Sequence, residues 1–227
     1  MTVNRLQVVV VLGVVCASMP CSVLWAQDDP FVPVTDAVLQ NPAPEDWLMW
    51  RRTLNGWGYS PLDQIDRGNV AGLQMVWARG LSEGSNQGTP LVYDGVMYMP
   101  NPGDRIQALD AASGDLHWEY QRSHPEDLDD HIITILSQIN RNIAIYGDRI
   151  IDTSADTHVF ALDVASGQLA WETEILDYRV LQAHQSSGPI IANGKIISGR
   201  GCMPKSGPDA CVITAHDALT GEELWRR

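Results

Sequence analysis

The chain has 227 residues, of which 28 are acidic and 15 are basic, and its formal net charge is −13 at pH 7. This excess of acid argues against a nucleic-acid partner and against a basic patch for an anionic membrane. The length suits one or two ordinary domains. Composition therefore narrows the class of partner without pointing to an activity.

The first 26 residues have the features of a signal peptide. Arg5 supplies the positive charge, residues 8–15 are apolar, and Ala26 precedes a polar, acidic stretch. The apolar run is short for a membrane span, and an uncleaved anchor is the alternative. Cleavage after Ala26 would place the mature protein in the periplasm, an oxidising compartment in which disulfides persist.

Two cysteines, Cys202 and Cys211, would remain in the mature chain. They flank a loop that is rich in Gly and Pro. We expect a disulfide between them that closes this loop, with two free thiols as the alternative. No Cys-x-x-Cys pair or nearby group of histidines accompanies them, so a zinc site is not expected.

The segment before the repeats is irregular. Residues 27–46 are rich in proline and predict an extended strap or a short broken helix. Residues 46–52 suggest one helical turn, and Trp50 and Trp57 suggest anchors on the domain surface. Residues 73–79 alternate between apolar and polar side chains, which predicts a strand.

From residue 89 onward the pattern is that of short strands between turns, and helical periodicity is absent. Tight turns are indicated at 94–95, 147–148 and 193–194. In the first unit the predicted strands are 89–92, 95–99, 105–109 and 116–120. The same order of four strands returns in the next two units, so the chain is predicted to be all-β.

Three segments share the pattern Ala-x-Asp-x-x-(Ser/Thr)-Gly-x-x-x-Trp, at residues 108–118, 161–171 and 215–225. A repeat of about 50 residues is typical of a propeller or another repeat array. The Asp side chain can accept backbone N–H groups across the turn, and the Gly supplies a positive φ. The Trp can pack on the neighbouring unit and bond its backbone. Three unrelated hairpins are the alternative.

This repeat resembles the tryptophan-docking motif of the quinoprotein alcohol dehydrogenases. These are eight-bladed β-propellers that hold pyrroloquinoline quinone (PQQ) and usually a calcium ion. Ser60-Pro61-Leu62-Asp63-Gln64-Ile65 is similar to the N-terminal segment of that family, and residues 88–98 are similar to its first blade. The resemblance covers residues 47–227 and implies a partial β-propeller of about three four-stranded blades. We therefore expect an N-terminal portion of a longer protein, completed by remaining blades or by another chain.

The resemblance also implies four contacts to PQQ. Gln87 stands where the family has a Glu that bonds the cofactor, and Ser154 matches a Thr or Ser at a strand end of the second blade. Ile139 and Arg141 match a Val-Asn-Arg segment of the family. We expect Gln87, Ile139, Arg141 and Ser154 to bind PQQ; the alternative for Arg141 is an ion pair with an acid at a blade edge.

The chain departs from the family at three places, of which Gln87 in place of the Glu is the first. Ile135 and Leu136 replace an adjacent pair of cysteines, and Met203 replaces the Glu that ligates calcium. A Met sulfur is a poor calcium ligand, so a standard calcium site is doubtful and no metal ligand is assigned. The family's catalytic Asp falls beyond Arg227, so no catalytic residue is expected here. The acidic cluster at 127–131 is interpreted as a solvated loop.

The resemblance implies the N-terminal part of a periplasmic PQQ-dependent dehydrogenase. Its substrate would be an alcohol or a sugar-like hydroxyl, and its electrons would pass to a cytochrome c or a quinone. Because a fold does not fix a function, two alternatives remain. One is a non-catalytic propeller scaffold or binding protein, and the other is an inactive truncated fragment.

Overall fold

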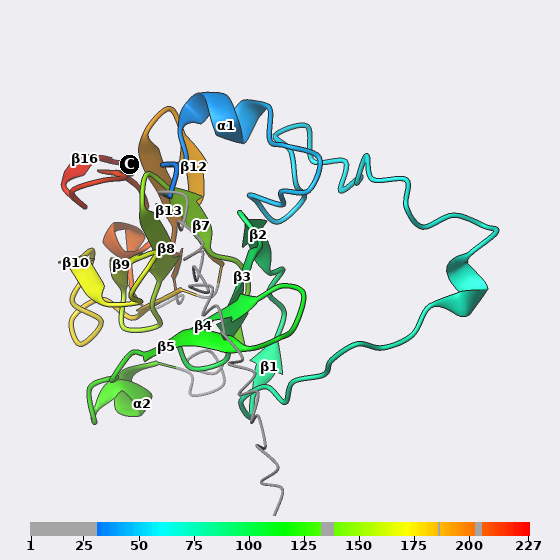
Figure 1. Ribbon diagram of the computed structural model, residues 1–227. Helices are drawn as coiled ribbons and strands as arrows, with labels where there is room; N and C mark the ends of the chain where they lie inside the picture. The colour runs from blue at the N-terminus through cyan, green and yellow to red at the C-terminus, as the bar shows by residue number, and fades with distance from the viewer. Residues whose placement is uncertain (1–30, 133–138, 186, 203–205) are drawn as a thin grey trace, which may run out of the picture. The chain divides into compact units, whose positions relative to one another are not determined.

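The body of the chain is three four-stranded antiparallel sheets in the computed structural model, which describes residues 31–132, 139–185, 187–202 and 206–227 (Figure 1). In each sheet the strands follow one another in sequence order. The predicted all-β partial propeller with three four-stranded blades is confirmed.

Each blade is a simple meander. The first contains β2 (Leu91–Tyr93), β3 (Val96–Asn101), β4 (Arg105–Asp110) and β5 (Leu116–Gln121). The second contains β7 (Ala144–Tyr146), β8 (Arg149–Thr153), β9 (His158–Asp163) and β10 (Leu169–Glu174). The third contains β12 (Ile190–Ala192), β13 (Lys195–Gly199), β15 (Ile213–Asp217) and β16 (Glu223–Arg226).

Short elements link and cover the blades. The helices are α1 (Asp36–Gln40), α2 (Leu128–His131) and the 3-10 turns η1 (Val70–Gly72) and η2 (Pro208–Ala210). β1 (Ser85–Asn86) pairs in parallel with β6 (Ile139–Asn140), and β11 (Ala183–His184) pairs with β14 (Gly201–Cys202). None of the helices in the described part of the chain has the length and hydropathy that a membrane crossing requires.

The repeated turn is built as its residues predict. One oxygen of Asp110 accepts the backbone N–H groups of Ala112 at 3.0 Å and Ser113 at 2.7 Å. Asp163 and Asp217 accept the matching pairs in the second and third blades. These bonds favour the carboxylate form, so each turn lowers the pKa of its own Asp.

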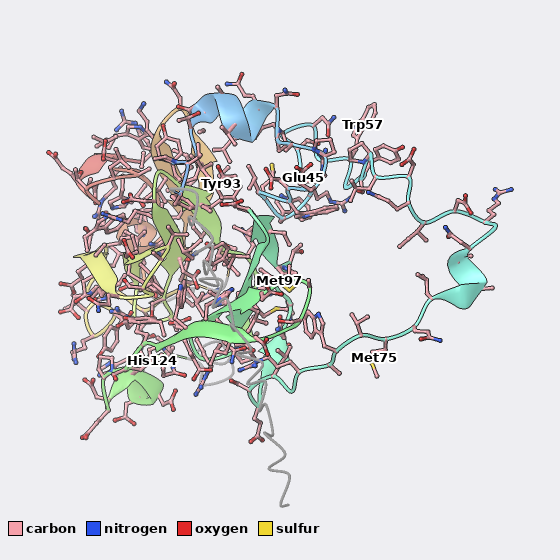
Figure 2. The ribbon with its side chains drawn as sticks, in the orientation of Figure 1. Glu45, Trp57, Met75, Tyr93, Met97 and His124 are labelled. Carbon is pink, nitrogen blue, oxygen red and sulfur yellow. The ribbon has the colours of Figure 1, made fainter. Side chains whose placement is uncertain are left out.

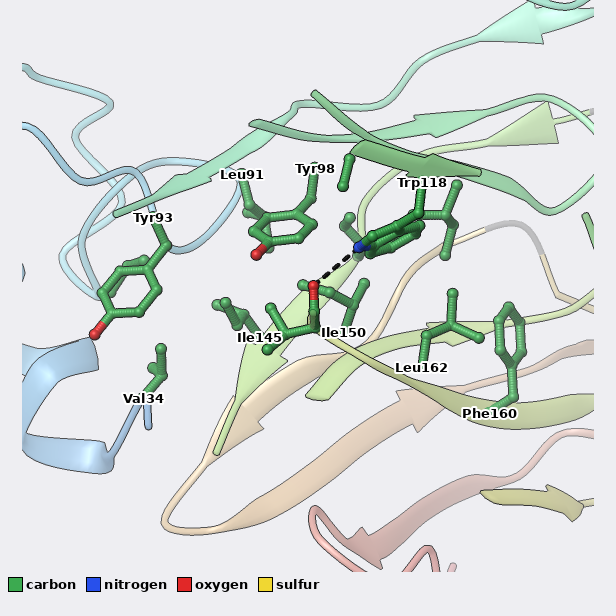
Figure 3. Packing of buried hydrophobic residues seen from close by; sticks show 14 of the residues in the cluster. Val34, Leu91, Tyr93, Tyr98, Trp118, Ile145, Ile150, Phe160 and Leu162 are labelled. Atoms are coloured by element: carbon green, nitrogen blue, oxygen red, sulfur yellow. Dashed lines mark hydrogen bonds between the residues drawn. The ribbon is translucent and has the colours of Figure 1, made fainter. Parts of the chain in front are cut away.

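A docking Trp lies on the turn glycine of the next unit at each of the junctions that the chain contains. A Cβ on Gly167 would approach the indole of Trp118 to 2.5 Å, so a side chain there would push the two blades apart. The indole N–H of Trp118 donates to the carbonyl of Val164 at 2.9 Å (Figure 3). The same stacking joins Trp77 to Gly114 and Trp171 to Gly221. The predicted packing is therefore confirmed for Trp118 and Trp171, and the predicted backbone bond is confirmed for Trp118. Trp77 adds one more docking residue at the start, and its indole N–H donates to the carbonyl of Ala111 at 3.3 Å.

The apolar core lies between the blades. Ile150 and Phe160 belong to one buried cluster with Trp118 of the first blade, whereas Ile151 and Val159 belong to a second cluster with Ile196 of the third blade. Successive residues of a strand point to opposite faces, so the middle blade packs on both neighbours. We call the contacts between blades one and two the first seam, and those between blades two and three the second seam.

The N-terminal segment corrects one prediction. Within the strap, α1 is capped by the hydroxyl of Thr35, which accepts the N–H of Val38 at 3.4 Å. The helical turn predicted at 46–52 is wrong, because Trp47 forms an antiparallel bridge with Val92. Exchange of backbone hydrogen bonds with β2 holds Trp47 extended, and the chain turns only afterwards, where the N–H of Arg52 donates to the carbonyl of Met49 at 2.9 Å.

We call residues 54–82 the arm. Two further predictions are wrong, one for a strand in the arm and one for Trp50 and Trp57. The strand predicted at 73–79 is wrong, since these residues pair with no strand among the described residues. Trp57 is 77% exposed and Trp50 is 47% exposed, so neither anchors the surface as predicted. Figure 2 labels Trp57 and Met75 on the arm. An alternating pattern alone does not make a strand when no partner strand is present.

Candidate functional site

Buried polar side chains gather at one end of the three blades. This polar end is where β2, β7 and β12 begin and where β3, β8 and β13 finish, opposite the repeated Asp turns. Its buried polar residues include Asn101, Asp104, Arg122, Asn140, Asp152, Thr153, Ser154, Asp156, Gln185, Ser198 and Arg200. Buried polar groups need partners or a ligand, so this end is the candidate site.

A short parallel pairing brings two of the predicted residues together. In the β1–β6 register Ile139 lies opposite Ser85, and Asn140 lies opposite Asn86. The N–H of Gln87 then donates to the carbonyl of Asn140 at 3.1 Å. Gln87 and Arg141 therefore follow these pairs side by side, from two different blades.

Two glycines allow the loops of the polar end to touch. A Cβ on Gly88 would lie 2.5 Å from the carbonyl oxygen of Arg141, and one on Gly188 would collide with the carbonyl of Asn142. The amide of Asn142 also donates to the carbonyl of Pro189 at 3.2 Å. Residues 85–89, 139–142 and 187–189 thus form one continuous edge across the three blades, which we call the rim.

A buried carboxyl supports the rim from below. The amide of Asn140 donates to Asp152 at 2.9 Å, and the N–H of Thr153 donates to its other oxygen at 2.7 Å. Burial, and then the charge of Asp104, raise the pKa of Asp152 well above its ordinary value. Asp152 fixes Asn140 and so the position of Arg141 next to it. Sequence reasoning missed Asp152, because no motif marks it.

Ser154 is engaged within the first seam. It is fully buried, and its hydroxyl donates to a carboxylate oxygen of Asp104. The same oxygen lies 2.8 Å from the Nε2 atom of His124. Although burial opposes the charged ring, the Asp104 carboxylate raises the pKa of His124 above its ordinary value. The contact of Ser154 with PQQ stays a prediction. The Ser154 hydroxyl already has Asp104 as its hydrogen-bond partner.

Arg122 joins the same seam through two acids. Its guanidinium lies 2.9 Å from Asp156 and 2.7 Å from Glu172. The ring of His158 lies 3.2 Å from Asp156. Burial would raise the pKa of Asp156, but His158 and Arg122 together lower it. Sequence reasoning missed this network, because its members come from two blades and are far apart in the chain.

The remaining sequence predictions fall partly outside the described residues. Ile135, Leu136 and Met203 lie there, and so does the side chain of Cys202. The Cys202–Cys211 disulfide therefore stays a prediction. Within the acidic cluster, Asp127 pairs with Arg179 at 2.6 Å. Among the described residues, no three His, Cys, Asp or Glu side chains are arranged to hold a metal ion.

The donor set of the rim fits an organic anion better than a metal ion. Arg141 brings a guanidinium, Gln87 brings an amide, and Ile139 brings an apolar surface. A guanidinium matches a carboxylate, whereas a divalent cation needs several hard oxygens. The rim residues therefore fit the carboxylates and flat ring of PQQ, and no step through a metal is derived.

Comparison with known proteins decides the family. Residues 47–226 match the family model described as "PQQ: Glucose/ethanol/alcohol dehydrogenase, beta-propeller domain". The chain belongs to this PQQ β-propeller family. It is similar to the dehydrogenase subunit of a quinone-dependent alcohol dehydrogenase from Komagataeibacter europaeus, with 32% identity over 94% of this chain and 30% of that protein. It is also 32% identical to quinoprotein alcohol dehydrogenase PedH from Pseudomonas putida, over 85% of this chain and 32% of that protein.

Solved structures agree on the fold. The quinohemoprotein alcohol dehydrogenase ADHIIG from Pseudomonas putida HK5 superposes with a TM-score of 0.71 at 29% identity, covering 86% of this chain and 28% of that one. A europium-containing methanol dehydrogenase gives a TM-score of 0.72 at 22% identity, over 84% of this chain and 33% of that one, and shows the fold alone. The chain thus spans about a third or less of the proteins that it matches.

Proposed function

We propose that this chain supplies three blades of a PQQ-dependent dehydrogenase that oxidises an alcohol or a sugar-like hydroxyl. Electrons would leave to a cytochrome c or a quinone. The observation that carries the proposal is the β1–β6 pairing, which sets Gln87 beside Arg141 on the rim. The family match and the quinone-dependent alcohol dehydrogenases among the relatives support it.

The chain's own residues would bind and orient the cofactor. Arg141 would donate to a carboxylate of PQQ, Gln87 would bond a polar atom, and Ile139 would contact the flat ring. PQQ, when bound, supplies the two-electron acceptor for the alcohol. Asp152 and Asn140 would hold Arg141 in place from below. No residue of this chain is assigned as the base that takes the alcohol proton.

We also propose that further blades complete the propeller around these three. The arm exposes a row of large apolar side chains, among them Leu54, Trp57, Ile65, Met75 and Val76. Full burial of one such side chain stabilises a protein by about 1.5–3 kcal/mol. Ile213 and Leu224 of the third blade are also exposed. A covering body of the same propeller would bury both surfaces.

Export and the disulfide belong to the same proposal. Cleavage after Ala26 would deliver the protein to the periplasm, where Cys202 and Cys211 would pair. Thiol alkylation followed by intact mass measurement checks this. We expect no label on the native protein and two labels after reduction. Labelling of both thiols before reduction would contradict the disulfide.

The direct test of function is alcohol-dependent reduction of an artificial dye by the native protein after addition of PQQ. Arg141→Met should weaken PQQ binding about tenfold or more, since a charged hydrogen bond contributes about 1.5–3 kcal/mol. Gln87→Leu should weaken it less. Arg149→Met, at the far turn of the second blade where Arg149 pairs with Asp148 at 2.9 Å, is the matched control and should bind PQQ normally.

Two results would contradict the proposal. One is a native protein that takes up no PQQ, and the other is equal PQQ affinity in the wild type and the Arg141→Met variant. The first result would favour the non-catalytic propeller scaffold, and the second would remove Arg141 from the PQQ site. The departures at Ile135, Leu136 and Met203 are the sequence features that this reading would explain.

A further inference from the structure

Arg200 is a buried cation without a partner of opposite charge. It follows β13 and is only 7% exposed. Its Nη1 atom donates to the hydroxyl of Ser198 at 3.1 Å and to the carbonyl of Gly199 at 3.3 Å. Among the residues that the structure describes, its Nε and Nη2 atoms have no hydrogen-bond partner. Half of this guanidinium is therefore buried and unsatisfied.

A buried guanidinium with unsatisfied N–H groups needs an anion beside it. Burial, and then the charge of Arg226, lower the pKa of Arg200 to about 9, so the group is still charged at neutral pH. A buried charge that is unpaired is strongly unfavourable. The residues outside the described ranges include only two acids, Asp28 and Asp29. No other acid of this chain is therefore available to Arg200, and a bound anion would supply the compensating charge.

The unsatisfied atoms select the shape of that molecule. Nε and Nη2 lie on the same edge of the guanidinium and form a fork that matches the two oxygens of a carboxylate. The two nitrogens would donate in parallel, one to each oxygen. A carboxylate would thus satisfy both atoms at once and neutralise the charge.

A second unsatisfied group lies on the neighbouring strand. In the β11–β14 ribbon, Ala183 pairs with Cys202 and His184 pairs with Gly201. The next pair of this register, one residue beyond the ribbon, would be Gln185 with Arg200, and residues paired in this way have their side chains on one face. Gln185 is 3% exposed, and its Oε1 atom has no partner. That oxygen can accept a hydrogen bond from a hydroxyl or N–H group next to the carboxylate.

The surroundings carry no negative charge that could replace the ligand. Ser198 and Thr214 are buried hydroxyls whose oxygens lie 3.5 Å apart. Burial lowers the pKa of His216 to about 4, so its ring is neutral. Glu223 instead pairs with Arg226 at 2.6 Å. The second seam is therefore electropositive around Arg200.

We propose that Arg200, with Gln185 beside it, binds a carboxylate-bearing small molecule between the second and third blades, at the polar end. The carboxylate could belong to PQQ or to a free organic acid. The site does not depend on the proposed dehydrogenase function. It stands on two unsatisfied buried side chains that neighbouring strands place on one face.

Thermal unfolding of the dialysed native protein in sodium acetate, compared with sodium chloride at equal ionic strength, tests the site. Acetate should raise the melting temperature of the wild type, because a ligand that binds only the folded state stabilises it. The gain should vanish in Arg200→Met and persist in Arg179→Met, which removes an exposed Arg on Asp127. Without acetate, Arg200→Met should melt at the wild-type temperature or above it.

Three results would overturn the proposal. These are no acetate gain in the wild type, an equal gain in Arg200→Met, or a large loss of stability in Arg200→Met without acetate. Arg200→Lys provides an independent second test. It keeps the charge but lacks the fork, so it should lose at least half of the acetate gain; a full gain would overturn the proposal.

Competition between labelled acetate and PQQ separates the two sources. Displacement of acetate by PQQ would support the site and assign it to a carboxylate of the cofactor. Simultaneous binding of both would support it as a site for a free organic acid. An acetate gain in a protein that binds no PQQ would support this site while the proposed dehydrogenase function fails.

Discussion

The two seams between the blades share a geometry but differ in how their charges are satisfied. In the first seam, Arg122 is held by Asp156 and Glu172, and the indole N–H of Trp118 bonds a backbone carbonyl. In the second seam, two nitrogens of Arg200 and the indole N–H of Trp171 have no hydrogen-bond partner within the described part of the chain. The stacking of Trp on Gly is the same in both.

This difference separates what holds the propeller together from what it is built to bind. The docking turn alone sets the spacing of the blades, since it recurs wherever the eleven-residue pattern recurs. The polar groups above it are not needed for the fold to repeat. Polar groups that are paired within the chain stabilise the seam. Polar groups that have no partner among the described residues indicate a bound ligand.

The largest expected effect is at Arg122. Arg122→Met would leave the buried carboxylate of Asp156 without its main cation, and removal of one partner of a buried pair costs about 3–5 kcal/mol. Urea unfolding measures this loss. Arg200→Met should cost nothing comparable. Equal losses of stability in Arg122→Met and Arg200→Met would contradict the claim that the charges of the two seams are satisfied differently.

The next effect is at the docking glycines. Gly167→Ala would press a methyl group into Trp118 at a φ of 69°, with an expected loss of about 2–4 kcal/mol from overpacking and backbone strain. Gly103→Ala is the matched control, since Gly103 has a φ of 75° and open space around it; it should cost about 1 kcal/mol. Similar losses at both positions would argue against docking.

A smaller effect separates the two indoles. Trp118→Phe removes a hydrogen bond to Val164, whereas Trp171→Phe removes an N–H that has no partner. The first change should therefore cost about 1 kcal/mol more than the second. Thermal unfolding of both variants checks the order. A larger loss at Trp171 would show that its N–H has a partner in solution.

The pH dependence of stability should be bell-shaped, because the two seams lose stability on opposite sides of about pH 6.5. The raised pKa values of His124 and His158 give the first seam stability that is complete below about pH 6.5 and is lost as pH rises through the folded values. The pKa of His216, lowered by burial to about 4, gives stability that is complete above about pH 6.5 and is lost as pH falls.

Urea unfolding between pH 4 and pH 9 resolves the two contributions. His124→Gln should flatten the alkaline side of the stability curve and leave the acid side unchanged. His216→Gln should do the reverse. If His216→Gln flattened the alkaline side instead, the assignment of a neutral buried ring in the second seam would be wrong.

Local chemistry was predictable from the sequence. The Asp–Gly turn, the order of strands and the docking of Trp118 on the following unit depend on residues within one eleven-residue pattern. The strand expected at 73–79 and the anchoring role of Trp57 failed for a physical reason. Both depend on partners that the described chain does not contain.

The polar end was only partly predictable. Resemblance pointed to Gln87 and Arg141, and the β1–β6 pairing sets them side by side. Resemblance also pointed to Ser154, whose hydroxyl bonds Asp104. Arg122, Asp152 and Arg200 carried no signal, because the pairing or isolation of a buried charge depends on which blades meet. That information appears only once the blades are packed.

The central claim is that these three blades work as part of a larger quinone-binding propeller. The most direct test is the intact mass of the native protein, with its quinone absorbance read on the same sample. The account predicts a mass well above 25.0 kDa together with bound quinone. A mass at or below 25.0 kDa, with no quinone taken up when PQQ is added, would contradict it.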